Sequence, residues 1–101
     1  MPPTGRAATM TSDMHAWYEV ADAADIPSPA LLVYPDRIEE NLRRMAAAAG
    51  GADRLRPHVK THKMPEVIGL CLAHGIGRFK AATIAEAEMT AAAGAADVLL
   101  A

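Results

Sequence analysis

The chain has 101 residues, with 10 Lys and Arg against 12 Asp and Glu, and therefore a formal net charge of −2. This balance gives no general attraction to nucleic acid or to an anionic membrane, and no apolar run reaches the roughly 18 residues of a membrane span. The single cysteine, Cys71, excludes an internal disulfide and a zinc site built on several cysteines. The N-terminus lacks the apolar core of a secretory signal, so we expect a cytoplasmic protein.

Prolines punctuate the first third of the chain. The first dozen residues are rich in Pro, Thr, Gly and Ala, and we expect them to be disordered. Residues 15–25 suggest a short helix, which the breaker IPSP ends. The apolar run ALLVY that follows lies between Pro29 and Pro35 and predicts a short strand. We therefore assign residues 1–27 to a partly disordered N-terminal segment, and residues 28–101 to part of a folded domain.

A helix is expected from Asp36 to a pair of glycines. Asp36 and Glu39 are three residues apart and fit the capping-box pattern at the start of a helix. Apolar side chains then recur at i, i+4 and i+7 and form one helical stripe, which comprises Ile38, Leu42 and Met45. Gly50 and Gly51 supply the end, because glycine accepts the left-handed conformation found there.

From residue 55 onward, strand-like and helical stretches alternate. Strands are expected at LRPHVK, RFKAAT and DVLLA. A helix that begins near Pro65 and ends at Gly75 separates the first two, and a helix capped by Thr83 and Glu86 separates the last two. This β-α-β-α-β order is the pattern of parallel βαβ units in α/β proteins. The apolar third strand is expected to be buried on both faces, as in a larger domain of which this chain is a fragment.

The stretch RPHVKTHK gathers basic and titratable side chains. In a strand, alternate side chains share a face, so Arg56, His58, Lys60 and His62 would point one way and Val59 the other. Basic groups on an inner face are costly to bury unless an anion compensates them. Ligands of α/β proteins bind at the carboxyl ends of strands, where Lys60 is expected to lie.

Three hypotheses account for this cluster. It is a solvated basic edge whose Lys stems lie on apolar surface, a general contact for anions or nucleic acid, or a site around a reactive lysine. Interleaved aromatic residues are absent and the net charge is negative, which disfavours the second hypothesis. Neighbouring positive charge and desolvation favour a neutral, nucleophilic lysine amine. The residue pattern leaves the first and third hypotheses open.

Three segments, read in order, resemble one enzyme family: SPALLVYPDRIEENLRRM, LRPHVKTHKMPEVIGLCLAHG and KAATIAEAEMTAAAGAADVLLA. They are similar to the N-terminal part of D-threonine aldolases and D-serine dehydratases, which are fold-type III pyridoxal-phosphate enzymes related to alanine racemase. The resemblance covers about residues 28–101, and RPHVKTHK is its most specific piece. It implies the opening of a TIM-type (β/α)8 barrel, truncated after the third barrel strand.

The resemblance implies a role for five residues at the cofactor. Lys60 would form the Schiff base with pyridoxal 5'-phosphate at the end of the first barrel strand, and would later move protons at the α-carbon of the substrate. Arg56 and His58 would support the position of Lys60, and His62 would face the cofactor. For both histidines, packing or hydrogen bonding is the alternative role. Thr83 is expected first as a helix cap and second as a contact on the cofactor side.

The activity implied is that of a lyase acting on a small D-amino acid, by retro-aldol cleavage of a D-threonine-type substrate or by dehydration of D-serine. The ligands that hold a divalent metal in many members would lie outside this chain, so we expect no metal site here and no activity of the chain alone. A homodimer is expected for the full-length protein. Lys63 is expected to be solvated and Cys71 to lie in the core. An amino-acid racemase of the same superfamily and a non-catalytic pyridoxal-phosphate-binding protein are the alternatives.

Overall fold

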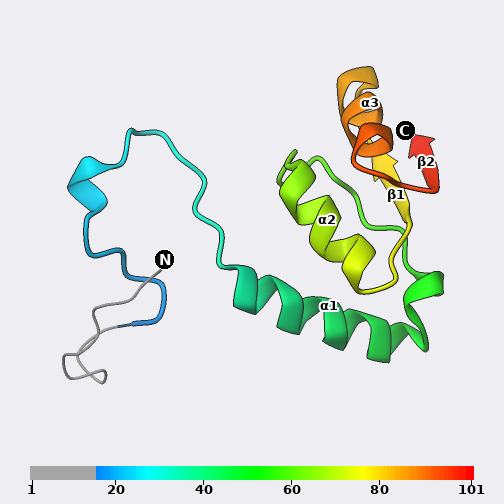
Figure 1. The fold of residues 1–101 in the computed structure, drawn as a ribbon, viewed down its shortest axis with the longest axis horizontal. Coiled ribbons are helices and arrows are strands. Elements are labelled where there is room, and N and C mark those ends of the chain that lie inside the picture. The colour runs from blue at the N-terminus through cyan, green and yellow to red at the C-terminus, as the bar shows by residue number, and fades with distance from the viewer. Residues whose placement is uncertain (1–15) are drawn as a thin grey trace. The chain divides into compact units, whose positions relative to one another are not determined.

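The computed structural model describes residues 16–101. Along the chain it has a short 3-10 helix, a long α-helix and a second 3-10 helix, followed by two α-helices that alternate with two strands (Figure 1). The chain divides into two units between Tyr34 and Pro35, and each unit is described by itself. The predicted disorder of the first dozen residues falls outside the described residues, and so does His15.

The helix predicted over residues 15–25 is wrong. Between residues 16 and 25 the structure forms only the 3-10 helix η2 (Ala23–Asp25), none of whose residues is buried. None of residues 16–25 is buried, so packing does not offset the cost of nucleating a helix here. Aromatic contacts order this unit: the hydroxyl of Tyr34 donates to the carbonyl of Tyr18 at 2.6 Å, and the ring of Trp17 meets both tyrosine rings edge to face.

The strand predicted at ALLVY is also wrong. The segment is irregular, with the side chain of Leu31 62% and that of Leu32 47% exposed. A strand requires backbone hydrogen bonds to a neighbouring strand, and no strand within the described residues pairs with this segment. The apolar composition of ALLVY is therefore not accompanied by pairing or burial.

The predicted long helix is confirmed as α1 (Pro35–Ala49), which the 3-10 helix η3 (Ala52–Arg54) follows. It begins one residue earlier than expected, because Pro35 occupies the first position, where its missing N–H is not needed. Asp36 therefore lies within the first turn and not at the cap. Along the predicted stripe, Leu42 is buried and Ile38 packs against the core, while Met45 is exposed. The helix ends at Ala49, and Gly50 follows it with a φ of 85°, which only glycine adopts freely.

The alternation of helices and strands after α1 is confirmed. The elements are α2 (Pro65–Ala73), β1 (Arg78–Ala81), α3 (Ile84–Ala92) and β2 (Asp97–Leu100). The two strands are parallel, with Arg78 beside Asp97 and Lys80 beside Leu99. Figure 1 shows the two strands side by side with α3 alongside them. The fold of this unit is therefore α/β with a parallel sheet, as predicted.

The strand predicted over residues 55–60 is wrong in its extent. The segment makes one isolated parallel bridge, between His58 and Lys80. The N–H of Val59 donates to the carbonyl of Lys80, and the N–H of Lys80 donates to the carbonyl of Pro57, both at 2.9 Å. Pro57 has no N–H to donate and the chain turns after Val59, so the ladder does not extend further.

The core of this unit lies on one face of the sheet. Its buried apolar side chains come from helices, strands and the segment before the bridge, and comprise Leu42, Val59, Ile68, Cys71, Ile76, Phe79 and Ala81. Because side chains alternate along a strand, Arg78 and Lys80 point to the opposite face from Phe79 and Ala81. The sheet therefore has an apolar face toward the helices and a polar face away from them.

Within the described residues, the last strand is not buried on both faces. The side chain of Leu99 is 50% exposed and that of Leu100 is 49% exposed. β2 is an edge strand, paired only with β1 within the described residues, so its apolar side chains are covered from one side. None of the helices in residues 16–101 is both long and apolar enough to cross a membrane.

Candidate functional site

Lys60 lies in a turn that follows the bridge to β1. The N–H groups of His62 and Lys63 both donate to the carbonyl of Val59, at 3.2 and 2.8 Å. Lys63 closes the turn in the left-handed conformation, with a φ of 55°. Val59 is fully buried and anchors the turn, whereas Lys60 is exposed. The amine of Lys60 is thus accessible at the carboxyl end of its segment, as predicted for a ligand-binding lysine.

Each histidine of the cluster accepts a backbone hydrogen bond two residues further along. Nδ1 of His58 accepts from the N–H of Lys60 at 3.2 Å, and Nδ1 of His62 accepts from the N–H of Met64 at 2.9 Å. In a neutral ring with this bond the proton lies on Nε2. The structure therefore supports the hydrogen-bonding alternative for Nδ1 of both residues, and Nε2 is the atom left to act as a donor.

The turn also changes where His62 points. The prediction that His62 shares a face with Arg56 and His58 by strand alternation is wrong, because the chain leaves the extended conformation at residue 59. His62 lies instead in the turn that leads into α2, and its side chain is half-buried. Desolvation by burial lowers the pKa of His62, so the neutral ring that accepts from Met64 is favoured. Whether His62 contacts a cofactor stays a prediction.

Arg56 crosses β1 and holds the amino ends of the strands together. Its guanidinium donates to the carbonyl of Phe79 at 2.9 Å and to Oδ1 of Asp97 at 2.8 Å. The hydrogen bond from Arg56, followed by its charge, lowers the pKa of Asp97. Asp97 is the first residue of β2, so this pair lies at the end of the sheet away from the Lys60 turn. A direct cofactor contact of Arg56 stays a prediction, and its contacts here fix the register of the sheet.

Thr83 and Glu86 form the predicted capping box at the start of α3. Oγ1 of Thr83 accepts from the N–H of Glu86 at 3.1 Å. Oε1 of Glu86 accepts from the N–H of Ala82 at 2.8 Å, one residue before the cap. The Thr83 oxygen is thus engaged as a helix cap, which confirms the first of its two predicted roles. Its cofactor-side role stays a prediction.

Glu86 has a second contact that the sequence did not predict. It is only 5% exposed, and its Oε2 lies 3.6 Å from Nζ of Lys63. The Lys63 side chain is 64% exposed, as expected for a solvated residue, but its ammonium pairs with this buried carboxylate. Glu86 therefore links the turn that carries Lys60 to the loop between β1 and α3. The capping-box pattern identified the residue, and no sequence signal identified the ion pair.

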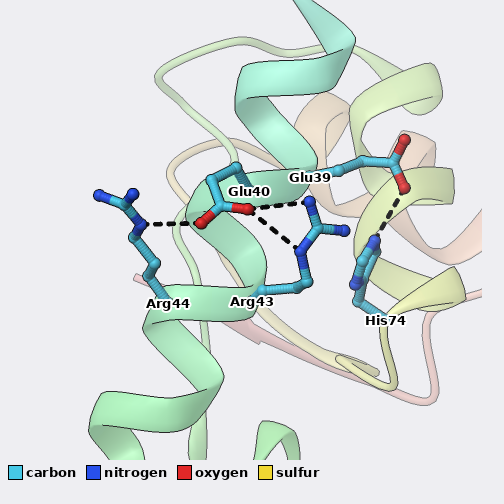
Figure 2. A network of polar contacts seen from close by, with 5 residues as sticks. All are labelled: Glu39, Glu40, Arg43, Arg44 and His74. Atoms are coloured by element: carbon cyan, nitrogen blue, oxygen red, sulfur yellow. Dashed lines mark hydrogen bonds and ion pairs between the residues drawn. The ribbon is translucent and has the colours of Figure 1, made fainter.

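A second polar network lies between α1 and the end of α2. Nε2 of His74 lies 2.9 Å from Oε1 of Glu39, which joins the two helices. Figure 2 shows the neighbouring Glu40 turned away from His74 and bonded to two arginines of its own helix, Arg43 and Arg44. The first of these bonds is the main cause of the lowered pKa of Glu40. This network contains none of the predicted site residues. Its contact between Glu39 and His74 holds α1 against the end of α2.

The described residues offer little other site chemistry. Within residues 16–101, no group of three or more His, Cys, Asp or Glu side chains is arranged to hold a metal ion. Cys71 is buried in the core, as predicted, and burial raises the pKa of its thiol. A buried thiol with a raised pKa is a poor nucleophile. Lys60 and the groups around it therefore remain the candidate site.

A protein-family model matches residues 33–101 of the chain, and its description is "Alanine racemase, N-terminal domain". The chain belongs to this family. The match includes the whole RPHVKTHK turn, both strands and all three α-helices, and it confirms the resemblance to fold-type III pyridoxal-phosphate enzymes. Membership in the alanine racemase family implies the start of a TIM barrel, with which the parallel α/β structure agrees.

One curated relative of this family member is the D-threo-3-hydroxyaspartate dehydratase of Delftia sp. (strain HT23). It is 38% identical over 77 residues, which are 75% of this chain and 20% of the relative. The chain therefore spans about a fifth of the length of the curated relative it matches. No solved structure matches the chain.

The residues of this alanine racemase-family chain suit pyridoxal phosphate, the cofactor that the resemblance implies. The aldehyde of that cofactor requires a primary amine, and Lys60 presents an exposed one at the carboxyl end of its segment. Its anionic phosphate requires donors or cations, and those near the turn include His58 Nε2 and Lys80, which the bridge places side by side. The donor set thus fits the cofactor.

Proposed function

We propose that the protein containing this chain is a pyridoxal-phosphate-dependent lyase that acts on a D-amino acid with a hydroxyl group at its β-carbon. One observation carries the proposal: in a member of the alanine racemase N-terminal family, Lys60 of RPHVKTHK lies exposed in a turn at the carboxyl end of its segment. Ligands of parallel α/β barrels bind at that end of the strands. The chain would supply the first part of the barrel and the cofactor's lysine.

The substrate class is proposed from the relative. The protein it resembles over 77 residues is named a D-threo-3-hydroxyaspartate dehydratase, which supports dehydration of a D-3-hydroxy amino acid. Retro-aldol cleavage of a D-threonine-type substrate is the second lyase reaction within the proposal. Both reactions act on the same arrangement of amine, α-carbon and β-hydroxyl. Residues beyond this chain would determine which of the two reactions occurs.

Bound pyridoxal phosphate would supply an electron sink that stabilises negative charge at the α-carbon. Lys60 would hold the cofactor through its amine. Once displaced by the substrate, it would take the proton from the α-carbon in dehydration, or give a proton to the α-carbon in retro-aldol cleavage, in which the β-hydroxyl loses its proton. The hydrogen bond from the N–H of Lys60 to His58 would orient the lysine backbone. The ion pair between Lys63 and Glu86 would hold the turn against α3. These residues position the amine and keep the turn from opening.

Borohydride trapping tests the proposal. The full-length protein is incubated with pyridoxal phosphate, reduced, digested and mapped for pyridoxyl-lysine. We expect the adduct on Lys60, with Lys63 and Lys80 as internal controls because they are the other two lysines of this chain. A Lys60→Ala variant should lose the adduct while a Lys63→Arg variant keeps it. A folded protein that is labelled elsewhere, or not at all, would refute the proposal.

The family match itself favours a second candidate, an amino-acid racemase, because the matching family is that of the alanine racemase N-terminal domain. Incubation with a D-3-hydroxy amino acid separates the two: a lyase yields a keto acid with ammonia or an aldehyde with glycine, and a racemase yields the L-isomer. A non-catalytic pyridoxal-phosphate-binding protein would carry the Lys60 adduct and form none of these products.

The proposal extends to the whole protein as a cytoplasmic homodimer acting on a small molecule. A divalent metal, held by residues outside this chain, would be detected as an activity that a chelator removes and the metal restores. Size-exclusion chromatography with light scattering would measure the oligomeric state. A full-length protein that is monomeric when loaded with cofactor would contradict the dimer.

A further inference from the structure

The polar face of the sheet carries charges that are unevenly matched. Parallel partners share a face, so the bridge and the strand register place two layers of side chains there. The first layer lies at the amino ends of the strands and comprises Arg56, Arg78 and Asp97. The second layer follows it toward the carboxyl ends and comprises His58, Lys80 and Leu99. In the first layer, Asp97 pairs with Arg56 at 2.8 Å and is also attracted by Arg78.

The second layer holds a cation without a counter-charge. Lys80 is half-buried, yet within residues 16–101 no side chain makes a hydrogen bond or ion pair with its ammonium. Among the six side chains of the two layers, Asp97 is the sole carboxylate, and Arg56 already engages it. The apolar Leu99 on the other side of Lys80 offers no polar atom. The ammonium of Lys80 therefore needs an anion from elsewhere.

His58 adds a hydrogen-bond donor next to this ammonium. Its Nδ1 accepts the N–H of Lys60, which leaves the proton of the neutral ring on Nε2. Within the described part of the chain, Nε2 has no partner. An ammonium and an N–H donor on adjacent segments are the groups that bind carboxylate or phosphate oxygens. Since Lys60 follows His58 by two residues, this layer directly precedes the predicted cofactor lysine.

The barrel supplies the physical reason for a ligand here. In a TIM barrel the face of the sheet away from the helices is the packed interior, and an ammonium buried there is unfavourable unless an anion compensates it. We propose that Lys80 and His58 form an anion subsite, which takes a carboxylate or phosphate oxygen of the ligand held at Lys60. This subsite rests on the proposed function and adds to it a named contact for the charged end of the cofactor or the substrate.

The test uses the full-length protein and the variants Lys80→Met and Lys80→Arg. Three constants are measured: the Kd of pyridoxal phosphate, the Kd of pyridoxal, which lacks the phosphate, and the KM of a D-3-hydroxy amino acid. We expect Lys80→Met to weaken one of them by roughly 10- to 100-fold, the effect of losing a charged hydrogen bond. Lys80→Arg should restore most of the loss because it keeps the positive charge.

The pattern of loss identifies the anion. If the phosphate binds the subsite, Lys80→Met weakens pyridoxal phosphate and leaves pyridoxal unchanged. If the substrate carboxylate binds it, both cofactor constants stay unchanged and the KM rises. A His58→Asn variant keeps an acceptor near the place of Nδ1 and has no donor at the place of the ring Nε2–H, so it should weaken the same constant. Arg44→Met is the matched control, since Arg44 is a cation on the exposed surface of α1 paired with Glu40.

Two results would overturn the subsite. In the first, all three constants of Lys80→Met stay within about twofold of the wild type while Lys60 is still trapped by borohydride. In the second, pyridoxal and pyridoxal phosphate weaken equally and the Tm falls, which would mean that Lys80 pairs with a carboxylate of the protein. Failure of the wild type to form the Lys60 adduct would instead refute the proposed function, and the subsite with it.

Discussion

Oε2 of the buried Glu86 lies 3.6 Å from Nζ of Lys63, and this ion pair ties the turn that carries Lys60 to the start of α3. The other carboxylate oxygen of Glu86 accepts the N–H of Ala82 at 2.8 Å. The side chain of Glu86 therefore joins the carboxyl end of the segment 55–60 to the carboxyl end of β1. The two ends at which barrel ligands bind are held together by a residue that also belongs to a helix cap.

Substitution of Glu86 separates its two roles. Glu86→Gln keeps a carbonyl that accepts from Ala82 and loses the attraction to Lys63, so we expect a small loss of stability, at most about 1 kcal/mol because the Lys63 end is exposed. Glu86→Ala also leaves the Ala82 N–H without its acceptor, which costs about 1–3 kcal/mol. Urea unfolding of the full-length variants measures both. In a cycle with Lys63→Met, additive losses would contradict the ion pair.

The contact between His74 and Glu39 is expected to stabilise helix packing. His74→Ala removes the partner of Glu39 across α1 and α2 (Figure 2), and we expect a loss of about 1 kcal/mol in the free energy of unfolding. Arg44→Ala is the control, because the Arg44–Glu40 pair is exposed on one helix and is expected to contribute little to stability. Equal losses in the two variants, measured by urea unfolding, would show that the interhelical contact adds nothing.

The sequence predicted the elements whose signals are local. Proline at the start of a helix, glycine after its end and the Thr83–Glu86 spacing all act within a few residues, and the helices α1, α2 and α3 begin and end close to where they were expected. The strands depend on partners that sequence patterns do not reveal. ALLVY has strand composition but no partner within the described residues, and LRPHVK keeps a single bridge because Pro57 lacks an N–H.

The candidate site shows the same division. The position of Lys60 at a carboxyl end followed from the alternation of elements and from the resemblance of RPHVKTHK. The turn that moves His62 off the shared face depends on hydrogen bonds to Val59, which no residue pattern specifies. The pairs Arg56–Asp97 and Lys63–Glu86 join residues more than twenty positions apart. Such contacts depend on the tertiary arrangement, and a single sequence does not encode them in a readable pattern.

The pair Arg56–Asp97 is expected to make stability depend on pH. The hydrogen bond and charge of Arg56 lower the pKa of Asp97 below its ordinary value of 3.8 in the folded protein. The unfolded chain therefore binds a proton at a higher pH than the folded chain. The contribution of this pair is complete above the unfolded pKa and is lost as the pH falls through the lowered folded pKa. Asp97→Asn should remove that part of the acid dependence, whereas Asp53→Asn, at an exposed position in η3, serves as the control.

Urea unfolding as a function of pH measures this effect. Below the folded pKa of Asp97, the wild type and Asp97→Asn should approach the same stability, and above the unfolded pKa the wild type should be more stable. Two curves that stay parallel across the acid range would contradict the prediction, because the substitution would then act through packing and not through the charge.

The half-buried His62 is expected to titrate at a lower pH than a solvated histidine. Desolvation lowers its pKa below 6.5, and protonation of Nδ1 would also break the bond from the N–H of Met64. Between the lowered folded pKa and 6.5, the unfolded chain binds a proton that the folded chain does not. The stability associated with the neutral ring is therefore complete above the unfolded pKa and is lost as the pH falls through the folded pKa.

Histidine hydrogen–deuterium exchange of the full-length protein, read by mass spectrometry, measures the midpoint of the His62 titration. The control is the free peptide RPHVKTHKM, in which His62 is solvated, and equal midpoints in peptide and protein would show that the turn does not bury this ring.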